Sequence, residues 1–127
     1  MLDPVEIPAG GSAETTVRLT IQNGYHVNAN PPSYSYLKPT ELEIPASDGV
    51  SVGFTVYPDP VTRKFSFADQ PLAVYEGETT LKAMLKADRS AKKGERHLSG
   101  KLRIQACDDQ VCYPPGTIDV MIPVRIK

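Results

Sequence analysis

Apolar residues recur at every second position along most of this chain. The clearest run lies near the C-terminus, where Ile118, Val120, Ile122, Val124 and Ile126 share one parity. Because successive side chains of a strand point to opposite faces of a sheet, this period predicts strands with one face on a core. The long predicted strands span about 17–22, 50–56, 80–85, 98–106 and 118–126, and shorter ones span about 5–8, 25–28, 41–45 and 72–75.

The stretches 50–56 and 79–96 each carry a specific structural prediction. In the run 50–56, the large side chains Val50, Val52, Phe54 and Val56 share one parity, so we expect all of them to face the core. Residues 79–96 form the one stretch that could be helical, but their apolar positions fit a period of two better than 3.6. The charged part of that stretch, residues 88–96, is predicted to be a solvated hairpin loop.

Turn-forming residues separate these runs. Asn23-Gly24, Asp48-Gly49 and the Pro114-Pro115-Gly116 segment are examples, and most of the 12 prolines and 9 glycines fall between strands. About eight or nine short strands divided by such turns predict an all-β fold, an antiparallel β-sandwich. No linker or repeat interrupts the 127 residues, so residues 1–127 are predicted to form a single domain.

Composition excludes some classes of function. The net charge is -1 and the basic residues are dispersed, which argues against a nucleic-acid partner. No apolar run approaches the roughly 18 residues that a membrane-spanning helix requires. The N-terminal residues Met1-Leu2-Asp3-Pro4 lack the basic and apolar segments of a signal peptide. The protein could therefore be cytosolic, or its signal could be missing from this sequence, and composition does not decide between the two.

The only two cysteines, Cys107 and Cys112, lie in a short polar turn that follows a predicted strand. A disulfide between them could simply pin the turn, although closing so short a loop stabilises a chain by only about 2 kcal/mol. Alternatively, the pair could be a reversible dithiol/disulfide couple. A metal site would need two further ligands, and the two available histidines, His26 and His97, do not stand at zinc-finger spacing.

Several neighbours could tune such a couple. Asp108 and Asp109 lie between the cysteines, where negative charge would raise the pKa of a thiol, although aspartates are also good turn formers. Replacing them would separate these interpretations. His26 could assist proton transfer near a thiol or could be a structural side chain of its strand.

The loop 64–70 contains two phenylalanines, Phe65 and Phe67, between polar residues. These rings could tuck into the core, or they could form a lid that shields a reactive group from solvent. Asp69, in the same loop, could add to the negative charge near the cysteines.

Three segments together resemble a known family. They are residues 24–32 (GYHVNANPP), 72–77 (LAVYEG) and 105–115 (QACDDQVCYPP). Their order and spacing are similar to those of the N-terminal domain of the thiol:disulfide interchange protein DsbD and its relatives, and the resemblance covers roughly residues 5–126. It implies an immunoglobulin-like sandwich that acts as a protein-disulfide reductase, with the cysteine pair as its redox group and no other cofactor.

The resemblance also implies roles for individual residues. Cys112 corresponds to the cysteine that forms mixed disulfides with partners, and Cys107 to the cysteine that resolves them. The loop 64–70 takes the place of a cap loop that carries an aromatic residue over the disulfide. His26 and Asn28 occupy positions that line the site in the family, and Tyr113 follows Cys112 in the motif.

The partners and the location follow from the same resemblance. The expected electron donor is a thioredoxin-like domain. The expected acceptors are a periplasmic disulfide isomerase or the thioredoxin-like protein of cytochrome c maturation. The chain would then be a periplasmic domain of a protein embedded in the inner membrane. The alternative is a non-catalytic immunoglobulin-like binding module with a structural disulfide.

Overall fold

The computed structural model describes residues 5–34, 37–65 and 70–127, and the regular structure in these ranges consists entirely of strands. The all-β prediction is therefore confirmed, and the described residues include no helix that could cross a membrane. The strands are β1 (Val5–Ile7), β2 (Ser12–Thr20), β3 (His26–Asn28), β4 (Glu41–Glu43), β5 (Val50–Val56), β6 (Val61–Arg63), β7 (Leu72–Tyr75), β8 (Glu78–Ala87), β9 (Gly94–Ile104), β10 (Ala106–Cys107) and β11 (Gly116–Ile126).

The described residues form eleven strands, against the eight or nine predicted, because β6 was not predicted and the predicted strand 98–106 is divided between β9 and β10. β6 has three residues and β10 has two, and neither is long enough to show an alternating pattern. The alternating pattern predicted one strand from Leu98 to Ala106. In the structure Gln105 interrupts that strand, so that β10 pairs in a different sheet from β9.

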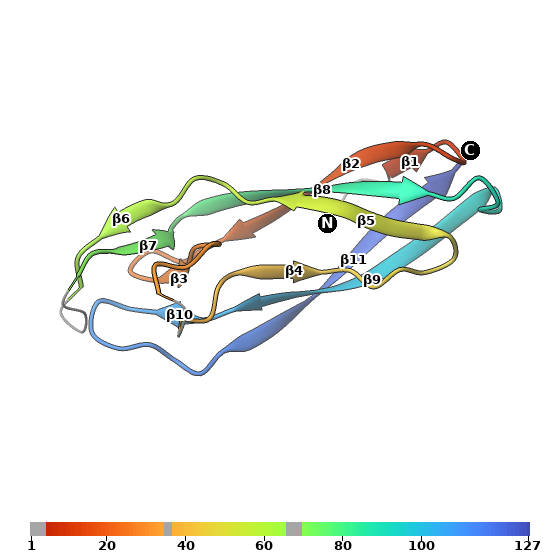
Figure 1. The fold of residues 1–127 in the computed structure, drawn as a ribbon. Coiled ribbons are helices and arrows are strands. Elements are labelled where there is room, and N and C mark those ends of the chain that lie inside the picture. Colours follow the sequence, from red (N-terminus) through yellow and green to blue (C-terminus); the bar gives the residue numbers. More distant parts are fainter. Residues whose placement is uncertain (1–4, 35–36, 66–69) are drawn as a thin grey trace.

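The strands form two facing layers and a smaller end sheet (Figure 1). One layer has the order β1-β11-β9-β4, the other has the order β2-β8-β5, and the end sheet has the order β10-β3-β7-β6. The pairing is antiparallel except that β1 runs parallel to β11. Figure 1 shows the end sheet at one end of the elongated sandwich and the β8–β9 loop at the other.

The main core lies between the two layers. The alternation predicted for β11 is confirmed at Ile122, Val124 and Ile126, which are buried there, whereas Ile118 at the start of the strand is exposed. β8 buries every second residue, including Leu81 and Leu85, so residues 79–87 are a strand and not a helix. β9 already begins at Gly94, so the charged hairpin loop is shorter than the predicted 88–96.

The prediction for the end of β5 is wrong. Val50 is buried, but Phe54 and Val56 are 56% and 50% exposed. The pairing of β5 with β8 shifts between Val52 and Phe54, where Gly53 is the extra residue of a β-bulge. Because side chains alternate with a period of two, one inserted residue turns the rest of the strand over.

Two smaller clusters support the end sheet. One contains Val27 of β3 and Tyr75 of β7, and the other contains Phe65, Leu72 and Val74. These clusters fix β3 and β7 against the rest of the molecule. The two-residue strand β10, which carries Cys107, is hydrogen-bonded along β3. The end sheet therefore provides the support on which the cysteine pair is presented.

Candidate active site

Cys107 and Cys112 are joined by a disulfide, and the turn between them is closed by the main chain. Asp108 N donates to Val111 O at 2.9 Å, and Tyr113 N donates to Ala106 O at 2.9 Å. The two cysteines differ in access to solvent. Cys107 is only 1% exposed, whereas Cys112 is an exposed residue. An incoming group therefore reaches the residue at position 112 and not the one at position 107.

The side chain of Asp108 organises this turn from within. Its Oδ1 accepts hydrogen bonds from Gln110 N and Val111 N, both at 2.8 Å, and its Oδ2 accepts one from the Tyr113 hydroxyl at 2.7 Å. An aspartate that bonds main-chain amides two and three residues ahead is a common way to build a tight turn. The turn-forming role considered for Asp108 is thus present in the structure.

These hydrogen bonds shift two pKa values. The amides of Val111 and Gln110, followed by the Tyr113 hydroxyl, hold the pKa of Asp108 below its ordinary value. The same contact acts on the phenol in the opposite direction. The hydrogen bond to Asp108 raises the pKa of Tyr113 to about 12. Asp108 is therefore ionised, and Tyr113 protonated, throughout the neutral range.

A tight turn leads the chain into β3 beside the disulfide. Tyr25 N donates to Gln22 O at 3.0 Å, and Gly24 supplies the positive φ of 90° that this turn uses. The turn leaves Tyr25 exposed, with its ring centroid 6.3 Å from that of Tyr113. Nothing in the sequence pattern singled out Tyr25 as a site residue, and only the pairing of β10 with β3 brings it here.

His26 lies directly opposite Cys107 in the pairing of β3 with β10. It is 2% exposed, and its ring stacks on Phe65 with the centroids 4.0 Å apart. Burial lowers the pKa of His26, and this effect outweighs the opposing influence of Glu76, Asp109 and Asp108. The structure thus brings His26 to the site as a buried, neutral ring at neutral pH.

Phe65 is 7% exposed and packs with Leu72 and Val74 of β7. The first of the two interpretations of this loop, a ring tucked into the core, therefore applies to Phe65. Its stacking on His26 nevertheless holds the start of the loop close to the strand that pairs with Cys107. Phe67 and Asp69 lie outside the described residues, so a lid formed by the loop stays a prediction.

Asn28 is buried behind the site. Its Nδ2 donates to Lys38 O at 3.0 Å and to Gln105 Oε1 at 3.3 Å. Gln105 Nε2 in turn donates to Tyr113 O at 3.3 Å. Hydrogen bonds through Gln105 therefore connect Asn28 to Tyr113, the residue after Cys112. In the sequence, Gln105 was noted only as the first residue of the motif 105–115. The interruption between β9 and β10 is the structural feature that places Gln105 there.

A groove of about 560 Å³ runs beside the disulfide. It is lined by Tyr25, His26, Phe65 and Asp109, together with the ion pair between Arg63 and Glu76. Asp109 is exposed, unlike the partly buried Asp108, and it contributes negative charge to this groove. Both aspartates are thus near the cysteines, but only Asp108 has the turn-forming contacts described above.

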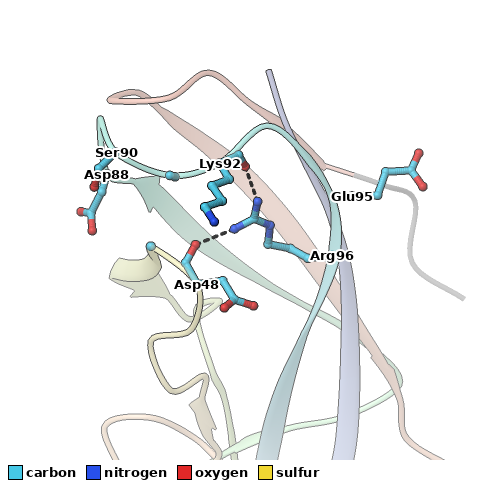
Figure 2. Close-up of a pocket in the computed structure, with 8 residues that line it drawn as sticks. Asp48, Asp88, Ser90, Lys92, Glu95 and Arg96 are labelled. Atoms are coloured by element: carbon cyan, nitrogen blue, oxygen red, sulfur yellow. Dashed lines mark hydrogen bonds between the residues drawn. The ribbon is translucent and has the colours of Figure 1, made fainter.

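A second groove, of about 570 Å³, lies around the β8–β9 loop (Figure 2). Figure 1 shows this loop at the end of the sandwich opposite the end sheet. Figure 2 shows Arg96 directed at two loops, with hydrogen bonds to the main-chain oxygens of Asp48 and Lys92. Arg96 thus ties the loop after β4 to the β8–β9 loop. This groove lies far from the disulfide and is therefore separate from the candidate active site.

Comparison with known proteins gives the family. The family model described as thiol:disulfide interchange protein DsbD, N-terminal, matches residues 3–122. The structure is similar to that of the reduced N-terminal domain of DsbD from Neisseria meningitidis, with a TM-score of 0.58, 20% identity, and coverage of 92% of this chain and 82% of that one. A family 123 glycoside hydrolase from Clostridium perfringens matches with a TM-score of 0.32 and 12% identity, over 95% of this chain and 22% of that one, and it supports no inference.

A search of curated protein sequences finds no match. The family match spans nearly the whole chain and includes the disulfide turn. The structural match has the immunoglobulin-like fold that the resemblance implied. This chain therefore belongs to the family of DsbD N-terminal domains.

Proposed function

We propose that this domain is an electron relay that reduces protein disulfides by thiol–disulfide exchange. It takes two electrons from a thioredoxin-like donor domain and passes them to periplasmic partners. The partners that the family suggests are a disulfide isomerase and the thioredoxin-like protein of cytochrome c maturation. The domain would do this as the periplasmic part of a protein embedded in the inner membrane, with its cysteine pair as the redox group.

The reaction requires only the two sulfurs and a partner disulfide. The Cys112 thiolate attacks one sulfur of the partner, the partner disulfide breaks, and a mixed disulfide forms. The Cys107 thiolate then attacks Cys112 Sγ, the Cys107–Cys112 bond forms, and the partner leaves as a dithiol once its two thiolates take up protons. Two electrons have moved to the partner, and the donor domain restores the dithiol by the reverse sequence.

The difference in exposure between the two cysteines is the observation that supports these roles. An attacking thiolate and a partner sulfur must approach each other directly, and Cys112 is exposed while Cys107 is 1% exposed. A buried Cys107 is well placed for the resolving step, since its target, Cys112 Sγ, belongs to the same turn. This assignment agrees with the roles that the family motif implies.

The surface around Cys112 suits a protein partner. Val111, Tyr113 and Tyr25 are exposed and apolar or aromatic, and they lie in the disulfide turn or immediately beside it. Exposed aromatic and aliphatic side chains around a reactive group are typical of a docking site. We therefore propose that partners dock on these side chains with their own disulfide over Cys112.

The loop 64–70 is proposed to shield the pair until a partner docks. The stacking of Phe65 on His26 supports this role, because it holds the start of the loop near β10. Phe65→Ala and Phe67→Ala, made separately, test it through the rate at which a small disulfide reagent oxidises the reduced pair. Faster oxidation in at least one variant is expected, and an unchanged rate in both would rule out a shielding loop.

Trapping of a mixed disulfide tests the assignment of the cysteines. The Cys107→Ala variant, mixed with an oxidised thioredoxin-like protein, should accumulate a mixed disulfide through Cys112 because no resolving thiol remains. The Cys112→Ala variant should trap little, since its only thiol is buried. The reverse pattern would contradict the assignment.

A further inference from the structure

The side chain of Gln105 connects a buried strand to the segment that carries Cys112. Gln105 lies between β9 and β10 and is partly buried. Its Oε1 accepts a hydrogen bond from Asn28 Nδ2 at 3.3 Å, and its Nε2 donates one to Tyr113 O at 3.3 Å. Tyr113 directly follows Cys112, so this side chain holds the residue next to the exposed cysteine.

Asn28, the partner of Gln105 in β3, is held in place by several further hydrogen bonds. Asn28 O accepts hydrogen bonds from Thr40 N at 3.1 Å and from the Thr40 hydroxyl at 2.8 Å. Asn28 Nδ2 also donates to Lys38 O at 3.0 Å, and both Asn28 and Thr40 are buried. Because Asn28 cannot shift without breaking several of these bonds, Gln105 is anchored to a rigid part of the end sheet.

The disulfide turn has two arms, and they are held differently. Cys107 belongs to β10 and is held by the pairing with β3. The arm with Cys112 does not reach β3. In the described part of the chain it pairs with the other arm through an isolated antiparallel bridge between Cys107 and Cys112, and hydrogen bonds to Asp108 and Gln105 hold it as well. While the disulfide is closed, it also restrains this arm. Reduction removes the restraint of the disulfide, so the position of the Cys112 arm then depends on contacts of this kind.

We propose that Gln105 is a positioning residue that keeps Cys112 Sγ within reach of Cys107 after the disulfide opens. This inference rests on the proposed function and concerns its second step. In that step Cys107 Sγ bonds to Cys112 Sγ while the bond from Cys112 to the partner breaks and the partner leaves as a thiolate. The rate and the equilibrium of such an intramolecular step depend on how closely the two sulfurs are held together.

Two substitutions test the role of Gln105. Gln105→Ala removes both hydrogen bonds, so we expect the equilibrium constant for closing the disulfide against glutathione to fall about three- to tenfold. Because a tenfold change is about 30 mV for this two-electron couple, the reduction potential should rise by about 15–30 mV. The mixed disulfide with glutathione should persist longer by a similar factor.

Gln105→Glu preserves the size of the side chain and gives a readout that simple packing would not. At pH 7 the carboxylate cannot donate to Tyr113 O, so the potential should rise as in Gln105→Ala. As the pH falls through the usual glutamate range near about 4.3, the protonated acid regains a donor. The difference from the wild-type potential, measured in dithiothreitol buffers at each pH, should then shrink.

Gln22→Ala is the matched control, because Gln22 is an exposed glutamine beside the site. Its potential should equal that of the wild type. If the wild-type pair exchanges, but Gln105→Ala and Gln105→Glu both have the wild-type potential at every pH, the positioning role is wrong and the proposed function stands. A wild-type pair that remains oxidised at about -330 mV would overturn the proposed function and the role of Gln105 together.

Discussion

The Tyr113 hydroxyl donates a hydrogen bond to Asp108 Oδ2 at 2.7 Å, which links the two arms of the disulfide turn from one side of the cysteine pair to the other. Asp108 Oδ1 also accepts hydrogen bonds from the main-chain amides of Gln110 and Val111. One carboxylate therefore shapes the turn and fixes the aromatic ring next to Cys112. Because Tyr113 directly follows Cys112, this contact also restrains the position of Cys112.

Asp108→Asn is expected to lower the pKa of Tyr113 from about 12 toward the ordinary value of 10.0. The physical reason is that an ionised acceptor stabilises the protonated phenol, whereas a neutral amide does so much less. NMR titration of tyrosine ring signals, with Tyr113 assigned through Tyr113→Phe, gives the value directly. Asp109→Asn is the control and should leave the pKa of Tyr113 high. If Asp108→Asn leaves it near 12 as well, the hydrogen bond is not its cause.

Asp109 provides a cleaner test of charge near the thiol, because Asp108 also holds the turn. In the reduced protein we expect the pKa of Cys112 to lie above the ordinary value of about 8.5, and Asp109→Asn should lower it. The shift should shrink at high salt, since Asp109 is exposed. The rate of alkylation measured against pH gives the midpoint.

Asp88→Asn, in the β8–β9 loop at the other end of the sandwich, is the control for Asp109→Asn. An alkylation midpoint that stays the same in Asp109→Asn would show that this charge does not act on the thiol.

The buried His26 ring predicts a dependence of stability on pH. Burial lowers the pKa of His26 below the value of 6.5 expected in the unfolded chain. Below about pH 6.5 the unfolded state therefore binds more protons than the folded state, so the free energy of unfolding should fall as the pH is lowered. Urea unfolding of the oxidised protein between about pH 5 and 8 measures this. His26→Gln should flatten the dependence, whereas His97→Gln, at an exposed position, should preserve it. A wild-type stability that is constant over this range would contradict the prediction.

Phe65 is expected to contribute to stability as well as to the site. Phe65→Ala removes a buried ring from its contact with Leu72, Val74 and His26, and such substitutions cost about 3–5 kcal/mol. Chemical denaturation should show a loss of this size. Phe54→Ala is a suitable control, because Phe54 is 56% exposed and should lose far less. A Phe65→Ala variant as stable as the wild type would mean that the ring does not support the end sheet.

The sequence predicted the sandwich where the alternating pattern was long. Ile122, Val124 and Ile126 are buried as expected, because a strand of eleven residues carries its period clearly. The pattern was misleading at Phe54 and Val56, where a bulge shifts the register. A bulge depends on pairing with another strand, and Gly53 alone did not reveal it.

For the site, the sequence revealed the two cysteines but not all of the residues around them. Cys107 and Cys112 could be found by counting cysteines, and the motif suggested their roles. The contacts of Asp108 follow from its place in the turn, but the positions of Tyr25 and Gln105 depend on β10 leaving the sheet of β9 and pairing with β3. Such pairing joins residues about 80 positions apart in the chain and leaves no local pattern that the sequence could display.

The reduction potential of the Cys107–Cys112 pair tests the proposed exchange function most directly. The purified domain is equilibrated in glutathione and dithiothreitol buffers of known potential, and the free thiols are trapped and counted. A couple that exchanges with thioredoxin-like partners should have a potential between about -270 and -120 mV. A pair that stays oxidised down to about -330 mV would instead be a structural disulfide, and the relay function would be contradicted.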